Sequence, residues 1–167
     1  AGTLTVNKGE LLIEPFYLKV TRDKPVTMAV DLTWQPQILN VHQLTYTHTN
    51  VLTLLGQGEL ALGDQWAINQ LTLRSRKTLV KPLYTHYLTG FLSNESQLSN
   101  LEASGFIKAT FNWNKNKDKR SGLVQLYNVN LEDQQKRFGL TGLHGKIQWS
   151  DAQELPSYLR WSSAYFA

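Results

Sequence analysis

Apolar and polar side chains alternate along most of the chain. In the stretch VTMAVDLTW, the even positions carry the apolar side chains Val26, Met28, Val30, Leu32 and Trp34. The stretch over residues 52–62 repeats this pattern, with Leu, Leu, Gly, Gly, Leu and Leu at its even positions. Because successive side chains of a strand point to opposite faces, a period of two predicts strands with one apolar face. Such strands are typical of antiparallel sheets.

The same alternation predicts further strands, near residues 3–7, 10–20, 38–48, 66–74, 105–114, 122–131 and 136–150. Clusters of glycine, proline and polar residues separate them and predict turns. The even spacing of these turns predicts a meander of about nine or ten strands.

Glycines recur at the head of the alternating stretches. Five of the 11 glycines begin the pattern G-x-[LI]-x-apolar: Gly2, Gly9, Gly58, Gly105 and Gly145. In addition, the apolar phase is even through Gly142 and odd from Leu143, a slip of one residue that is typical of a β-bulge. Repeated bulges predict a strongly curved, twisted sheet. For any single copy, an ordinary turn glycine before a strand is an equally good interpretation.

One segment departs from alternation. Residues 78–105 show helical spacing, with stripes formed by Leu79, Leu83, Tyr87 and Phe91 and by Leu98 and Leu101. Ser93 or Asn94 is suited to cap a second helix, and Gly105 to end it. We therefore expect a short helical insertion near residues 78–104 that packs on the apolar face of the sheet. The predicted fold is all-β and mainly antiparallel, a single domain over residues 1–167.

Composition narrows the class of protein. Hydrophobic residues are 41% of the 167 and charged residues 18%, a balance typical of a globular chain. Cysteine is absent, which excludes disulfides, thiolate zinc sites and cysteine nucleophiles. The sequence has no apolar run of about 18 residues and no secretory signal pattern. Since the chain begins in the middle of an alternating stretch, we expect a fragment of a longer protein, with any membrane anchor outside it.

Motifs for catalysis or metal binding are missing from the sequence. It has no G-x-S-x-G, no phosphate-binding glycine loop and no H-E-x-x-H. His42, His48, His86 and His144 stand in unrelated segments, and we expect them to be scattered on the surface. A glycosidase carboxylate pair meets only in space and leaves no signature in a sequence. The sequence predicts no enzyme, no metal site and no cofactor.

The net charge of +4 raises the question of an anionic partner. Basic residues cluster in RSRK at 74–77 and in KNKDKR at 115–120. The second cluster is typical of a hairpin tip that lysines keep soluble, and an attraction to anionic lipid headgroups fits it equally well. Nucleic-acid binders usually place such residues on one face among aromatic rings, so we do not expect nucleic acid as a partner.

The most distinctive feature is the amount of apolar surface on long, bent, one-faced strands. A closed sandwich would bury this surface as core, whereas a partly open sheet would present a trough suited to acyl chains. The residues expected to line the trough are Met28, Val30, Leu32, Trp34, Leu60, Leu62, Ile107, Phe111, Trp113, Ile147 and Trp149. They would bind by removing acyl surface from water, at about 25 cal/mol per Å².

A carbohydrate-binding β-sandwich is the alternative function. In that case Trp34, Trp113, Trp149 and Trp161 would stack on sugar rings. A sugar platform would need these rings on the polar face or at loop tips. The first three continue the apolar phase of their strands, which favours a groove or a core.

Three stretches resemble a known family: LTYTHTNVLTLLGQGELALGDQWAINQLTL, LYTHYLTGFLSNESQLSNLEASGFIKATFNW and VNLEDQQKRFGLTGLHGKIQWS. They are similar to segments of the AsmA-like group, which includes the TamB and YdbH types of large Gram-negative envelope proteins. The resemblance implies a periplasmic protein with an inner-membrane anchor. It also implies a long curled sheet whose groove carries phospholipid between the membranes or serves outer-membrane biogenesis, with other envelope proteins as partners. It implies no catalytic residues.

Overall fold

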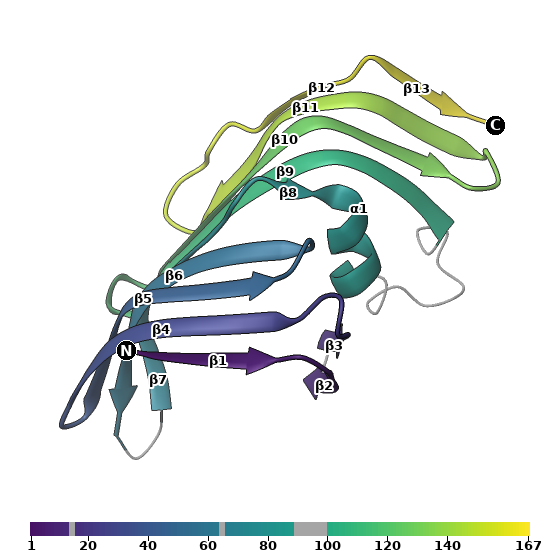
Figure 1. Ribbon diagram of the computed structural model, residues 1–167. Helices are drawn as coiled ribbons and strands as arrows, with labels where there is room; N and C mark the ends of the chain where they lie inside the picture. The colour runs from purple at the N-terminus through teal and green to yellow at the C-terminus, as the bar shows by residue number, and fades with distance from the viewer. Residues whose placement is uncertain (14–15, 64–65, 89–99) are drawn as a thin grey trace.

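The computed structural model describes residues 1–13, 16–63, 66–88 and 100–167. Most of these residues form antiparallel strands of one large sheet, which curls around a short helical segment (Figure 1). The all-β fold, the curved meander and the short helical insertion expected from the sequence are therefore confirmed.

The large sheet has 11 strands, and its order follows the chain closely. The strands are β1 (Gly2–Val6), β4 (Val26–Gln35), β5 (Ile38–His48), β6 (Leu52–Leu62), β7 (Trp66–Ser75), β8 (Thr78–Leu79), β9 (Leu101–Asn114), β10 (Lys119–Asp133), β11 (Phe138–Ser150), β12 (Tyr158–Arg160) and β13 (Ser163–Phe166). Neighbours run in the order β1-β4-β5-β6-β7-β9-β10-β11-β12, while β8 pairs with β9 and β13 pairs with β11. Strands β4 and β6 confirm the one-faced strands predicted from the alternation over residues 26–34 and 52–62.

The single strand expected near residues 10–20 is a hairpin instead. Strands β2 (Gly9–Ile13) and β3 (Phe16–Val20) pair antiparallel with each other and form a separate two-stranded sheet. The sequence places a proline at position 15, between the two strands. Proline cannot donate a hydrogen bond to a strand ladder, which disfavours a continuous strand here.

Within the described residues, the helical insertion begins two residues later than expected. It consists of α1 (Val80–Leu83) and the π-helical turn η1 (Tyr84–Leu88). Leu79 belongs to β8 and is 47% exposed, so its expected packing on the sheet is wrong, and Val80 is the buried residue. Leu101 begins a strand rather than continuing a helix. The expected helical residues Phe91, Ser93, Asn94 and Leu98 lie outside the described part of the chain.

Gly105 does not end a helix but lies inside β9. Gly105 has a φ of +91° and lies opposite Asn128 of β10, which has a φ of +49°. The register of the two strands shifts at this point. A Cβ at Gly105 would collide with the Asn128 carbonyl oxygen, so only glycine fits this close approach. The bulge confirms the interpretation of Gly105 as a bend in the sheet.

Other register shifts occur along the sheet. The predicted phase slip before Leu143 is confirmed, because the β10–β11 register shifts between Leu126 and Val129 and again between Val129 and Leu131. Further shifts occur in the β4–β5, β5–β6 and β6–β7 pairs. Bulges increase the local twist and bend a sheet, which accounts for the curl in Figure 1.

The packed core lies at one end of the sheet, under the helical insertion. Val80 of α1 packs with the buried residues Ala103, Val129 and Leu143 of β9, β10 and β11. Among the described residues, the buried apolar side chains outside this cluster are Val20, Val26 and Val51. Val26 pairs with the last residue of β5 and so lies at the same end. The opposite strand ends carry no buried large apolar side chain within the described ranges.

Candidate functional site

From β1 to β11, paired positions on one face of the sheet carry apolar side chains or glycine. Side chains of directly paired residues lie on the same face. One row of pairs crosses eight strands, through Gly2, Val30, Leu44, Gly56, Leu73, Phe111, Gly122 and Trp149. A neighbouring row runs through Leu32, Val41, Gly58, Leu71 and Trp113. We call the surface that contains these rows the apolar face.

The register places all eleven residues predicted to line a trough on the apolar face. In β4, β9 and β11 these residues either belong to one of the two rows or lie an even number of positions from a row residue on the same strand. Leu60 and Leu62 lie two and four positions after Gly58 in β6. Five of the eleven are exposed: Met28 (39%), Leu32 (37%), Trp34 (75%), Ile147 (41%) and Trp149 (44%). The other six are half-buried. None is buried as a core side chain would be.

Ile107 differs from the other ten residues in its surroundings. It pairs with Thr78 of β8 and packs against the cluster formed by Val80, Ala103, Val129 and Leu143. The helical insertion therefore covers this part of the apolar face. We assign Ile107 to the packed end rather than to the open part of the face.

The opposite face of the sheet is mainly polar. In β4 it carries Thr27, Ala29, Asp31 and Thr33. Farther along the sheet, Thr72 donates a hydrogen bond to Asn112 (3.1 Å), and Asn112 donates one to Ser121 (3.4 Å). Polar groups of this face bond to one another along the surface, so the two faces of the sheet differ sharply in chemistry.

The helical insertion contacts both halves of the sheet from inside the curve (Figure 1). Val80 packs on β9, β10 and β11, whereas Tyr87 of η1 bonds to Tyr46 and His48 of β5. Since Tyr46 pairs with Met28, these β5 residues also lie on the apolar face. The apolar face is therefore the concave one.

A cluster of polar groups joins η1 to the sheet. The Tyr87 hydroxyl lies 2.8 Å from Nδ1 of His48 and 2.7 Å from the Tyr46 hydroxyl. The rings of His48 and His86 meet edge to face with centroids 5.2 Å apart, and Lys24 Nζ lies 3.0 Å from Nε2 of His86. We call these five residues the histidine cluster. It closes one end of the apolar face.

The expectation that all four histidines are scattered on the surface is wrong for His48, which is 1% exposed. His86, 38 positions later in the chain, contacts it because η1 folds back onto the sheet. The even phase shared by Leu44, Tyr46 and His48 was the signal in the sequence that could have placed His48 on the apolar face. No pattern in the local sequence predicts the contact between His48 and His86.

Burial and positive neighbours keep both histidines neutral. Burial lowers the pKa of His48 below its ordinary value, and the nearby His86 and Lys24 lower it further. Burial and Lys24 likewise lower the pKa of His86. Burial raises the pKa of Tyr87, and its bond to Tyr46 raises it further. Within the described ranges, no group of three or more His, Cys, Asp or Glu residues could hold a metal ion.

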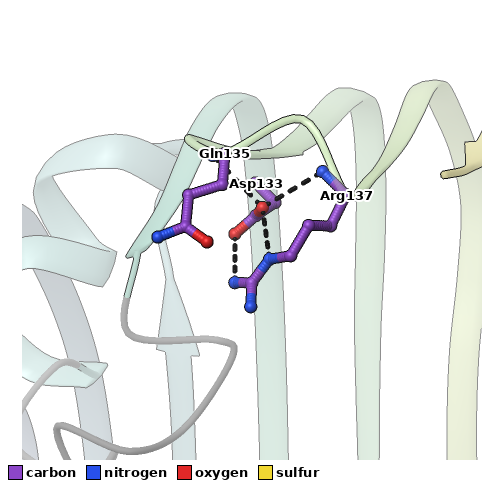
Figure 2. A network of polar contacts seen from close by, with 3 residues as sticks. All are labelled: Asp133, Gln135 and Arg137. Carbon is purple, nitrogen blue, oxygen red and sulfur yellow. Dashed lines mark hydrogen bonds and ion pairs between the residues drawn. The ribbon is translucent and has the colours of Figure 1, made fainter.

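Among the described residues, Asp133 is the other fully buried titratable group, and its bonds give it a structural role. Figure 2 shows its carboxylate accepting hydrogen bonds from Nε (2.8 Å) and Nη2 (2.7 Å) of Arg137 and from the backbone N–H groups of Gln135 and Arg137. The Arg137 side chain lowers the pKa of Asp133 to about 2, more than its burial raises it. A carboxylate with all these partners closes the β10–β11 turn and is not free for chemistry.

No protein-family model, curated protein or solved structure matches the chain. Among the helices of the described residues, none is long and apolar enough to cross a membrane. The resemblance to the AsmA-like group therefore stays a prediction based on the sequence.

Proposed function

We propose that the chain binds the acyl chains of lipids on its apolar face, as a segment of a protein that carries phospholipid between the membranes of a Gram-negative envelope. One observation carries the proposal: the concave face of an open, 11-stranded sheet is apolar from β1 to β11. Soluble proteins rarely leave large continuous apolar surfaces uncovered unless these bind a partner.

The physical basis of binding is the removal of apolar area from water. Each methylene group of an acyl chain contributes about 0.8 kcal/mol when it is fully buried. Exposed side chains such as Met28, Leu32 and Ile147 offer this area without directional bonds. Such a surface suits a ligand that slides, and it requires neither a cofactor nor catalytic residues.

The cellular setting belongs to the same proposal. A periplasmic location, an inner-membrane anchor outside the chain and contacts with other envelope proteins follow from the resemblance to the AsmA-like group. The curled, one-faced sheet supports this setting because that group is expected to use a groove of this kind.

Sugar binding receives less support from the same geometry. Trp34, Trp113 and Trp149 share the apolar face with aliphatic side chains. A platform for sugar rings needs polar partners around the indole, since sugars carry many hydroxyl groups. Trp161 follows β12, lies outside the strands and is 57% exposed.

Replacing Phe111 with asparagine tests lipid binding on the apolar face. Full burial of a Phe side chain contributes about 1.5–3 kcal/mol. Because Phe111 is half-buried in the fold, a ligand that covers the rest of its ring gains roughly half of this free energy. A loss of about 1 kcal/mol corresponds to a roughly fivefold weaker affinity. Thr110→Asn is the matched control, because Thr110 is the adjacent residue on the polar face. Capture of a photo-crosslinkable phospholipid analogue measures binding, and thermal melting measures stability.

Capture should fall for Phe111→Asn and stay unchanged for Thr110→Asn, with both proteins folded. Ile107→Asn should behave differently and lower the melting temperature, because Ile107 packs against the cluster under α1. No capture by the parent protein, or equal capture by the Phe111 and Thr110 variants, would contradict the proposal.

A further inference from the structure

Four of the five tryptophans lie at the strand ends opposite the helical insertion. They are Trp34 near the end of β4, Trp66 at the start of β7, Trp113 near the end of β9 and Trp149 near the end of β11. Trp34, Trp66 and Trp149 are 75%, 79% and 44% exposed, and Trp113 is half-buried. We call these four residues the Trp rim. In Figure 1 the β4–β5 and β9–β10 turns both lie toward the left, away from α1.

The register places the Trp rim on the apolar face. Trp34 pairs with Leu39, which pairs with Leu60 of β6. Trp66 pairs with Leu62, two residues farther along that strand. Trp113 pairs with Leu71, and Trp149 pairs with Gly122 and lies over it. The apolar face therefore ends, on this side, in exposed indole rings.

A basic hairpin tip adjoins the Trp rim. The β9–β10 connection over residues 115–120 carries four basic side chains and one carboxylate. Asn114 accepts a hydrogen bond from the backbone N–H of Lys117 (3.1 Å), which orders the tip. Arg120 pairs with Trp113 in the register and forms an ion pair with Asp151 (2.7 Å). Lys115, Lys117 and Lys119 are exposed and form no ion pair within the described part of the chain.

Indole rings and lysines at one edge match the chemistry of a bilayer surface. Tryptophan prefers the interface between water and hydrocarbon, because its ring is apolar and its N–H is polar. Lysines close to the surface are attracted by anionic headgroups, and this attraction falls off within a Debye length. The lysines begin two residues after Trp113, so both groups can reach the same surface together.

We propose that the Trp rim and the basic hairpin tip dock on the surface of an anionic phospholipid bilayer. The indoles lie at the interface, and Lys115, Lys117 and Lys119 lie among the headgroups. Docking in this orientation brings the open side of the apolar face to the membrane. It goes beyond the proposed function, since attachment to a bilayer does not require a lipid to be held on the apolar face.

Flotation with lipid vesicles tests the docking surface. The parent protein should float with vesicles of equal parts phosphatidylcholine and phosphatidylglycerol, and much less with phosphatidylcholine alone. The triple variant K115Q/K117Q/K119Q should bind the anionic vesicles at least about tenfold more weakly. The matched control is K8Q/K81Q/K108Q, which removes three exposed lysines outside the tip and should bind as the parent does.

Fluorescence tests the position of the indole rings. Vesicles with brominated acyl chains should quench the parent protein, and W34F/W66F should lose a large part of this quenching. Absence of flotation, equal losses in the two lysine triple variants, or unchanged quenching in W34F/W66F would overturn the proposal. So would self-association of the protein that buries the Trp rim in the absence of lipid.

Phe111→Asn separates the docking from the proposed function. This variant should float with anionic vesicles as the parent does, because Phe111 belongs to neither the Trp rim nor the hairpin tip. Lipid capture from solution without flotation contradicts the docking surface and leaves the proposed function standing. Flotation that follows the lysine and tryptophan variants, without capture from solution, supports docking and contradicts the proposed function.

Discussion

Replacing Tyr87 with phenylalanine removes one oxygen atom from the junction between η1 and the apolar face. That oxygen bonds to Nδ1 of His48 and to the hydroxyl of Tyr46. His48 is 1% exposed, and its Nε2 already has no hydrogen-bond partner among the described residues. The variant therefore leaves both nitrogens of a buried imidazole unsatisfied, whereas Tyr46 is only half-buried and can turn its hydroxyl toward water.

The expected loss of stability follows from these two bonds. An unsatisfied buried polar group costs about 1–3 kcal/mol, and an ordinary hydrogen bond contributes about 0.5–1.5 kcal/mol. We expect Tyr87→Phe to lose about 2–3 kcal/mol and Tyr46→Phe to lose about 1 kcal/mol, because Tyr87 keeps its bond to His48 in the second variant. For a chain of this size, about 2–4 °C of melting temperature corresponds to each kcal/mol.

Thermal melting followed by circular dichroism measures both variants and the double variant. Tyr87→Phe should lower the melting temperature by roughly 5–10 °C, clearly more than Tyr46→Phe. His48→Leu combined with Tyr87→Phe is a further control, since removal of both bonding partners in similar volume is often nearly neutral. Equal melting temperatures for Tyr87→Phe and Tyr46→Phe would refute the argument that the buried imidazole decides the loss.

Two further predictions concern pH and backbone strain. Burial lowers the pKa of His48 and His86 in the folded protein. Below about pH 6.5 the histidines of the unfolded chain bind protons, whereas those of the folded protein stay neutral. The free energy of unfolding should therefore be highest above about pH 6.5 and should fall below it. Thermal melting at a series of pH values between about 8 and 5 should show this fall, and the fall should be shallower in H48Q/H86Q. An equally steep fall in H48Q/H86Q would contradict its assignment to these two histidines. Gly105→Ala should lose more than about 2 kcal/mol, from positive φ and from the collision with Asn128. Gly9→Ala, whose Cβ would meet Val6 at 3.8 Å, should lose less than about 1 kcal/mol, and equal losses would show that the bulge exerts no strain.

The alternating phase predicted strands and faces well because it is a local property of the chain. The even positions of β4 keep one face from Val26 to Trp34, as the sequence indicated. The phase slip before Leu143 likewise marked a bulge. Eleven residues from four distant strands thus lie on a common face, because the alternation within each strand determines which of its sides is apolar.

Contacts between distant segments were harder to predict. The helical spacing of Leu79, Leu83 and Tyr87 was correct in kind, but pairing of Leu79 with Phe106 draws this residue into β8. The meeting of His48 and His86 depends on the path of η1 across the sheet, which no local pattern encodes. The Trp rim similarly becomes visible only when the ends of β4, β7, β9 and β11 are aligned by their register.

The order of strands along the large sheet bears on how the protein unfolds. Each strand pairs with its neighbours in the sheet, and in the described part of the chain the helical insertion also joins β5 to β9 and β11 outside the strand ladder. Stability in such an architecture approaches a sum of nearest-neighbour terms, as in solenoid proteins. Strands at either margin can therefore detach while the middle stays folded, and cooperativity is limited to the part that α1 and η1 bridge. An open sheet of this kind can therefore yield locally where a ligand binds, without a global transition.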